Sequence, residues 1–184
     1  MTATPLAIPG VVLLEPRVHE DARGWFCESY NEHALAKCGI TAKFVQDNRS
    51  YSAKQGTLRG LHVQATPSAQ AKLISCTRGR ILDVAVDVRR DSPTYLKWVS
   101  AELNEHNRHQ LFVPRGCLHG FITLCDHVEV FYKVDALYSP AHDRAVRWND
   151  PAFNINWGIA QPILSEKDAT APLWHELQEE FLCE

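Results

Sequence analysis

Residues 71–88 read AKLISCTRGRILDVAVDV, two runs of apolar and β-branched residues on either side of an Arg-Gly pair. Runs of this kind joined by a short turn that contains glycine are typical of antiparallel strands. Because successive side chains of a strand point to opposite sides, Lys72 should share a face with Ile74 and Cys76. The stretch therefore predicts two paired strands, one of which carries a lysine on an apolar face.

Similar runs recur at close intervals along the chain, with turn signals rather than helical segments between them. This rhythm favours an all-β barrel or sandwich over a parallel α/β fold. Helices are expected only over Asn31–Cys38 and from about Ala171 to Leu182. Besides the two runs above, which give strands at Ala71–Thr77 and Ile81–Val88, the predicted strands are Val11–Glu15, Gly24–Tyr30, Phe44–Ser50, Thr57–Gln64, Trp98–Leu103, Gln110–Val113, Gly120–Leu124 and Val128–Tyr138.

Length and composition narrow the class of protein. A chain of 184 residues is expected to form a single domain spanning 1–184, and its net charge of −3, without a basic patch, argues against nucleic-acid or membrane-surface binding. We find neither a secretory signal nor an apolar run approaching the roughly 18 residues of a membrane span. The six cysteines lack C-x-x-C or zinc-ribbon spacing, so reduced thiols in a cytoplasmic protein are expected.

Strand alternation places further polar groups on apolar faces. In Val128–Val134 the side chain of Tyr132 falls on the same face as the valines, and Gln46 and Asn48 fall with Phe44. Each polar group alone can equally be a satisfied residue of the core or its rim. Several of them converging from neighbouring strands on one apolar interior indicate a pocket whose groups have perturbed acidity.

The strand over residues 57–64 gives an ambiguous pattern. Simple alternation puts His62 on the same face as Leu58 and Gly60 and leaves Arg59 on the opposite face. A bulge at Gly60 would change this arrangement, and periodicity alone does not decide between the two.

These polar residues lie within a series of short motifs that together cover nearly the whole chain. The motifs include Asp21-x-Arg23-Gly24-x-Phe26-x-Glu28, Phe44-Val45-Gln46-Asp47-Asn48, Leu58-Arg59-Gly60-Leu61-His62, Gln70-Ala71-Lys72-Leu73, Pro114-x-Gly116-x-x-His119-Gly120-Phe121, Tyr132-Lys133 and Leu164-Ser165-Glu166-Lys167-Asp168. In their order and spacing they resemble the dTDP-4-dehydrorhamnose 3,5-epimerase family of the cupin superfamily.

The resemblance implies a cupin-type antiparallel β-barrel (a jelly roll, or double-stranded β-helix) and a homodimer in which the amino-terminal segment reaches the neighbouring site. It also implies an isomerase without cofactor or metal, which acts in dTDP-rhamnose biosynthesis on a dTDP-4-keto-6-deoxyhexose. The implied reaction converts dTDP-4-dehydro-6-deoxy-D-glucose to dTDP-4-dehydro-L-rhamnose by proton exchange at C3 and C5 through an enolate.

The resemblance also implies roles for individual residues. His62 corresponds to the general base, Asp168 to the carboxylate that orients it, Tyr132 to the acid on the other face of the sugar, and Lys72 to the group near the enolate oxygen. The remaining matches are substrate contacts. They are Gln46, Asn48, Arg59 and His119 along sugar and phosphate, Arg23 and Glu28 from the dimer partner, Tyr138 stacking on the base, and Phe26, Asp143 and Lys167.

The chemistry of such a reaction requires the same kinds of residue. Removal of a proton next to a ketone needs a positioned base and stabilisation of the enolate oxygen, for which His62 and Lys72 are suited. Inversion needs a proton from the opposite face, which a phenol with a reference pKa of about 10 supplies when a nearby cation assists its ionisation. A diphosphate favours arginine, here Arg59, because a guanidinium offers paired donors.

The chain departs from the family pattern at a few positions, and alternative functions remain to be considered. Val63, Cys117 and Leu118 differ from the usual residues and are expected to reshape the sugar pocket, and Asp143 replaces a glutamate, which shortens its reach. One rival is a mono-epimerase of another dTDP-deoxysugar. Others are a metal-dependent cupin oxygenase, for which His62-Val63-Gln64 lacks a second histidine, and a sensor without turnover.

Overall fold

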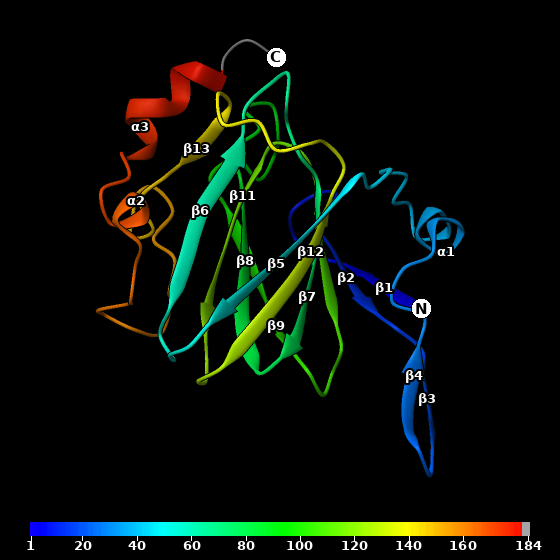
Figure 1. Ribbon diagram of the computed structural model, residues 1–184. Coiled ribbons are helices and arrows are strands. Elements are labelled where there is room, and N and C mark those ends of the chain that lie inside the picture. The colour runs from blue at the N-terminus through cyan, green and yellow to red at the C-terminus, as the bar shows by residue number, and fades with distance from the viewer. Residues whose placement is uncertain (182–184) are drawn as a thin grey trace.

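The computed structural model describes the backbone of residues 1–181 and the side chains through Glu179. Antiparallel strands and a few short helices make up this part of the chain, as Figure 1 shows. This confirms the prediction of an all-β protein with few helices. Within the described residues, no helix is long and apolar enough to span a membrane.

Most of the strands belong to two sheets. The first sheet contains, in this order, Thr2–Pro5 (β1), Val12–Glu15 (β2), Gln110–Val113 (β10), Lys72–Arg78 (β7), Val128–Val134 (β12) and Gln46–Ser52 (β5). The second contains Asp143–Ala145 (β13), Leu58–Gln64 (β6), Cys117–Thr123 (β11), Arg80–Asp87 (β8) and Trp98–Asn104 (β9).

The two sheets pack face to face around a buried apolar cluster. Ile74 and Val130 contribute to this cluster from the first sheet, and Ala85 and Phe121 contribute from the second. Inward-facing side chains alternate with outward-facing ones along each strand, as in other packed sheets. In β12, the three valines Val128, Val130 and Val134 are buried and Tyr132 packs against the same cluster, which confirms the predicted alternation.

Segments outside the sheets cover their outer faces. The helices Glu166–Ala169 (α2) and Trp174–Leu177 (α3) and the 3₁₀ turn Gln178–Phe181 (η1) lie over the second sheet (Figure 1), where Trp174 packs against its outer apolar residues. The helix Glu32–Lys37 (α1) covers part of the first sheet with Leu35.

A separate hairpin projects from the two sheets near the amino terminus. It consists of Val18–Asp21 (β3) and Gly24–Cys27 (β4), which pair only with each other among the described strands (Figure 1). The side chains of Trp25 and Phe26 on this hairpin are exposed, at 55% and 70%. Large apolar groups in such a position are candidates for contact with another protein surface.

Some predicted elements differ from the observed ones. β1 and β3 were not predicted because their short, largely exposed sequences lack apolar alternation, and β13 was not predicted because it has only three residues. The carboxy-terminal helix begins at Trp174 rather than Ala171, since Glu176 caps the backbone N–H of Leu173. Leu182 lies outside the described residues, as does Cys183, and the other five cysteines are free.

Gly60 produces an irregularity in β6 that resolves the ambiguity of this strand. His119 of β11 pairs with His62, whereas Phe121 pairs with Arg59, so two residues of β6 oppose one residue of β11 between these pairs. The prediction that His62 shares a face with Leu58 is therefore wrong, because this bulge turns both Arg59 and His62 inward and leaves Leu58 in the outer cluster.

The close approach of backbones at Gly60 leads to a stability prediction. Gly60 has φ of +133°, and a Cβ atom there would lie 2.6 Å from Cα of Gly120 and 3.0 Å from the carbonyl oxygen of His119. We expect Gly60→Ala to lower the free energy of unfolding by about 2 to 4 kcal/mol, from backbone strain and overpacking. Denaturant unfolding measures this change.

Gly24→Ala is the matched control, because Gly24 also has a positive φ, of +125°, but a Cβ atom added there would meet no other atom within 4 Å. Equal losses of stability in the two variants would contradict the importance of the close approach at Gly60.

Candidate active site

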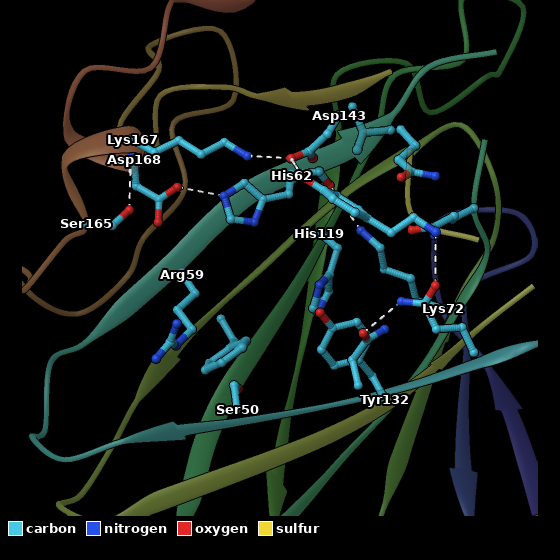
Figure 2. A pocket seen from close by; sticks show the side chains of 17 residues that line it. Ser50, Arg59, His62, Lys72, His119, Tyr132, Asp143, Ser165, Lys167 and Asp168 are labelled. Atoms are coloured by element: carbon cyan, nitrogen blue, oxygen red, sulfur yellow. Dashed lines mark hydrogen bonds and ion pairs between the residues drawn. The ribbon is translucent and has the colours of Figure 1, made fainter. Parts of the chain in front are cut away.

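A cavity of about 410 Å³ opens between the two sheets, and polar side chains surround it (Figure 2). The strands β5, β7 and β12 of the first sheet form one wall, and β6 and β11 of the second sheet form the other. The strands of Lys72, Tyr132 and Gln46 were predicted to be neighbours of the strand of His62. β7, β12 and β5 are indeed adjacent, but β6, which carries His62, faces them from the other sheet. The lining residues are Gln46, Asn48, Ser50, Arg59, His62, Val63, Gln64, Gln70, Lys72, His119, Phe121, Tyr132, Tyr138, Asp143, Ser165, Lys167 and Asp168.

His62 and Asp168 form a pair at one wall of this cavity. The Nε2 atom of His62 lies 2.6 Å from Oδ1 of Asp168, which is buried at the start of α2 behind the helix cap Ser165. Burial acts to raise the pKa of the Asp168 carboxyl, but hydrogen bonds from His62 and its surroundings outweigh this effect and hold the pKa below its usual value. The carboxylate therefore fixes a proton on Nε2 and leaves the lone pair of Nδ1 available as a base.

Lys72 is a buried ammonium group beside His62. Its Nζ donates to the backbone carbonyl oxygen of His62 over 3.3 Å. Burial lowers the pKa of Lys72 from 10.5 to about 8, although the negative charges of Asp143 and Asp83 oppose this shift. Lys72 thus remains largely charged at neutral pH and can stabilise an anion that forms nearby.

Tyr132 reaches the cavity from the first sheet, the wall opposite to that of His62 (Figure 2). Burial raises the pKa of its phenol, whereas the positive charge of Arg59 opposes the shift. Arg59 itself is held by Ser52 and by the backbone carbonyl of Tyr51. The site therefore combines a neutral phenol with a cation that favours its ionisation during a reaction.

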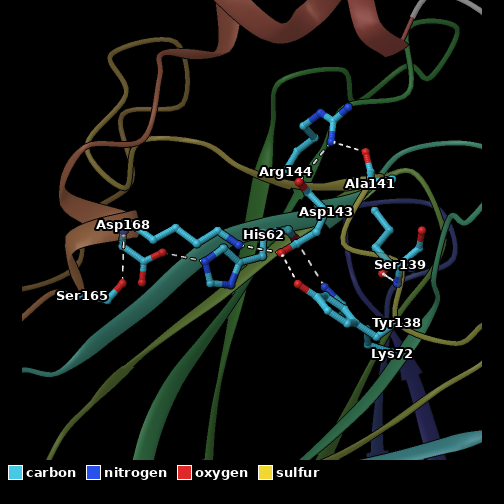
Figure 3. Close-up of polar contacts among 11 residues, drawn as sticks. His62, Lys72, Tyr138, Ser139, Ala141, Asp143, Arg144, Ser165 and Asp168 are labelled. Atoms are coloured by element: carbon cyan, nitrogen blue, oxygen red, sulfur yellow. Dashed lines mark hydrogen bonds and ion pairs between the residues drawn. The ribbon is translucent and has the colours of Figure 1, made fainter.

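The mouth of the cavity contains a network centred on Asp143 (Figure 3). Its Oδ2 atom accepts from Nζ of Lys167 at 2.6 Å and from the hydroxyl of Tyr138 at 3.1 Å. Gln46 accepts from the backbone N–H of Tyr138 and donates to Asn48. The shorter aspartate side chain therefore does reach both neighbouring residues.

Other residues of the site were not predicted. Asp83 lies behind His119, with its Oδ1 atom 2.8 Å from Nε2 of the imidazole. The only signal in the sequence was a carboxylate at an inward position of the run over residues 81–88. Gln64 and Gln70 bond the backbone of the loop that carries Tyr138, and their glutamine side chains gave no specific signal.

Arg23 and Glu28, expected from a dimer partner, and Phe26, predicted as a substrate contact, do not line the cavity of their own chain. Arg23 is highly exposed at the tip of the hairpin and pairs with Asp21. Phe26 is exposed on β4, and Glu28 accepts a hydrogen bond from Asn31. The structure thus separates these residues from the other predicted site residues.

The residues that depart from the family pattern differ in whether they line the cavity. Val63 lines the cavity, whereas Cys117 and Leu118 are buried in apolar clusters and do not line it. An effect of Cys117 and Leu118 on the sugar pocket stays a prediction, and it would have to act through the packing of the core. Among the side chains that the structure describes, which end at Glu179, no group of three or more His, Cys, Asp and Glu is placed to hold a metal ion.

Comparisons with known proteins agree on one family. The family model described as dTDP-4-dehydrorhamnose 3,5-epimerase matches residues 5–176. A dTDP-4-dehydrorhamnose 3,5-epimerase of Sinorhizobium fredii is 51% identical over 177 residues, which cover 96% of this chain and 91% of the relative.

Solved structures show the same similarity. A dTDP-4-dehydrorhamnose 3,5-epimerase from Bacillus anthracis, crystallised with TDP and PPi bound, is 50% identical, with a TM-score of 0.91 and coverage of 94% of this chain and 98% of that one. A 3,5-epimerase from Legionella pneumophila in complex with dTDP-4-keto-L-rhamnose is 37% identical, with a TM-score of 0.92 and coverage of 98% and 96%.

The low pKa of Lys72 leads to a prediction for stability. Between pH 8 and 10.5 the unfolded chain keeps a proton on Lys72 that the folded chain has lost, so folding becomes more favourable as the pH rises. We expect the free energy of unfolding of the wild type, relative to Lys72→Met, to increase by roughly 3 kcal/mol across this window.

Chemical unfolding of both proteins at several pH values measures this difference. The methionine variant is the control for every other group that titrates in the same range. A difference between the two proteins that stays constant with pH would contradict the account of Lys72.

Proposed function

The chain belongs to the dTDP-4-dehydrorhamnose 3,5-epimerase family, and from this premise we propose how its cavity residues carry out the epimerisation. It is an isomerase that converts dTDP-4-dehydro-6-deoxy-D-glucose to dTDP-4-dehydro-L-rhamnose, a step of the dTDP-rhamnose pathway. One observation carries the mechanism: the paired imidazole of His62 and the neutral phenol of Tyr132 come from facing sheets to line the same cavity.

His62 acts as the general base. Its Nδ1 atom removes the proton from the carbon next to the ketone, the C–H electrons form a carbon–carbon double bond, and the carbonyl oxygen becomes the enolate oxygen. Asp168 stabilises the imidazolium that results, because its carboxylate is already bonded to Nε2. The ammonium group of Lys72 stabilises the negative charge on the enolate oxygen.

Tyr132 returns a proton to C5 from the opposite face. When the enolate collapses to the ketone, its double-bond electrons take the phenolic proton and the configuration of the carbon is inverted. Arg59 supports the transient phenolate, since its positive charge acts to lower the pKa of Tyr132. The imidazolium of His62 then loses its proton to solvent and the phenolate of Tyr132 takes a proton from solvent. The cycle thus regenerates both groups, leaves the ketone unchanged and consumes no oxidant or reductant.

Residues around and above these groups bind the sugar nucleotide. Arg59, held by Ser52 and Tyr51, meets the diphosphate with its remaining guanidinium donors. His119, Gln46 and Asn48 contact the sugar and phosphate. At the mouth, Tyr138 stacks on the base, and Lys167 and Asp143 supply further substrate contacts; the exposure of Tyr138 supports its role.

The proposed assembly is a homodimer of single cupin-like domains, each spanning residues 1–184 with a closed jelly-roll barrel. The projecting hairpin supports this proposal, because Arg23 and Phe26 lie exposed and away from the cavity of their own chain. In the dimer, Arg23, Phe26 and Glu28 complete the nucleotide site of the neighbouring subunit. We place the reaction in the cytoplasm, which the free thiols of the described cysteines support.

The roles of the acid and the base give a first prediction. In deuterated water, Tyr132→Phe should still bind dTDP but lose most incorporation of deuterium with inversion at C5, roughly 10²-fold or more, because the phenolic proton donor is gone. His62→Ala should abolish exchange at both C3 and C5. Proton and mass spectra of the sugar locate the label.

Tyr51→Phe is the control, since Tyr51 lies on the neighbouring strand β5, its hydroxyl bonds His127, and it does not line the cavity. This variant should retain wild-type exchange. Full inversion at C5 by Tyr132→Phe would remove Tyr132 from the mechanism.

The proposed contribution of each hairpin to the site of the neighbouring subunit gives a second prediction. Arg23→Ala and His62→Ala should each be inactive or nearly so, but their mixture should recover about a quarter of wild-type turnover after subunit exchange. Half of the dimers are then mixed, and one of their two sites combines an intact cavity with an intact hairpin.

A mixture of His62→Ala with Tyr132→Phe should recover nothing, because both residues belong to the same cavity. If the hairpin served its own chain, the first mixture would show no gain either.

A further inference from the structure

Asp83 is a completely buried carboxylate that the proposed reaction does not use directly. It lies on β8 between Ile81 and Ala85, whose side chains belong to the apolar cluster between the sheets. Its Oδ1 atom bonds His119, and its Oδ2 atom has no hydrogen-bond partner among the described residues. An ionised carboxylate in such surroundings is strongly unfavourable unless cations nearby compensate it.

Two residues that line the cavity stabilise this carboxylate, one through a hydrogen bond and the other through its charge. His119 contacts Asp83 directly, over 2.8 Å between Nε2 and Oδ1. Lys72 reaches the same interior from the facing sheet, and the charge of Asp83 acts to raise its pKa. Asp83 itself is not a lining residue, so any effect on the reaction must pass through His119 and Lys72.

The arrangement of strands connects Asp83 with the proposed base. His119 on β11 lies directly opposite His62 on β6, and β8 is the other neighbour of β11. Each imidazole uses Nε2 to bond a buried carboxylate, Asp168 for His62 and Asp83 for His119. In both rings, Nδ1 is therefore the nitrogen that remains for a ligand.

We propose that Asp83 is a positioning residue of this epimerase, which orients His119 through Nε2 and places a buried negative charge in the interior that Lys72 enters from the facing sheet. The inference rests on the proposed function of the cavity. Asp83 touches no substrate atom. Its removal therefore affects the charged transition state more than the binding of the ground state.

Asp83→Asn tests the proposal, because it preserves the shape of the side chain and removes its charge. We expect kcat to fall about 10- to 100-fold while KM changes much less, as is usual when a residue that orients a functional group is changed. The deuterium-exchange assay with the dTDP-4-keto-6-deoxyglucose substrate measures both constants.

The dependence of kcat on pH distinguishes a change of charge from a loss of packing, because a loss of packing alone would not shift it. Lys72 is active as an ammonium, so wild-type kcat should fall as the pH rises through about 8. The charged or titratable groups that act on Lys72 are Asp143, Asp83, Cys117 and Lys167. Removal of the charge at position 83 leaves less negative charge near the ammonium. The fall of kcat at high pH, the alkaline limb of the kcat profile, should therefore move to lower pH in the variant.

Asp87→Asn is the matched control. Asp87 is also completely buried on β8 and points to the same side as Asp83, but its carboxylate bonds Arg89, Ser92 and Thr94. This variant should lose stability without a shift of the alkaline limb. Equal effects of the two substitutions on kcat and on the limb would overturn the proposal.

A measurement on the wild type keeps the proposal testable if Asp83→Asn does not fold. Nitrogen-15 spectra of the His119 ring should show a proton on Nε2, and a ring protonated on Nδ1 alone would overturn the proposal. Absence of any exchange by the wild-type enzyme would instead refute the proposed function. Wild-type exchange together with an unchanged kcat and pH profile in Asp83→Asn would refute only the role of Asp83.

Discussion

The burial of one ammonium group between two β-sheets is the constraint on which the rest of the site depends. Lys72 is buried on an apolar face, which lowers the pKa of its ammonium group, and the negative charges of Asp143 and Asp83 oppose this shift. Asp143 in turn bonds Lys167, and Asp83 bonds His119. The compensation of one buried charge thus connects residues from both sheets and from α2, and all of these residues except Asp83 line the cavity.

A local irregularity of the backbone turns two functional side chains of β6, Arg59 and His62, into the cavity. In a regular strand, Arg59 and His62 would point to opposite faces, because they are three residues apart. The bulge next to Gly60 turns both side chains toward the interior. There His62 bonds Asp168, and the positive charge of Arg59 acts to lower the pKa of Tyr132. Only glycine fits where the backbones of β6 and β11 come so close, so a single residue couples the packing of the second sheet to the geometry of the site.

The sequence predicts the parts of this structure that follow from periodicity, and the resemblance to a family supplies the rest of the site. Alternation placed Lys72 and Tyr132 inside correctly, and ten predicted strands overlap observed ones. It failed for β6, since the effect of a bulge depends on the partner strand. The contact of Asp83 with His119 was not predictable, because β8 and β11 are distant in sequence and their register is set by packing. β13 was missed because its three residues are too few to show alternation, and the glutamines that bond the Tyr138 loop gave no specific signal.

The most direct test of the account is a crystal structure of the protein with a dTDP-linked 6-deoxyhexose bound. The account requires the hexose ring to lie between the two sheets, with the imidazole of residue 62 on one face of the ring, the phenol of residue 132 on the other, and the ammonium of residue 72 nearest the oxygen on C4. A sugar bound with both rings on the same face, or outside this cavity, would contradict it.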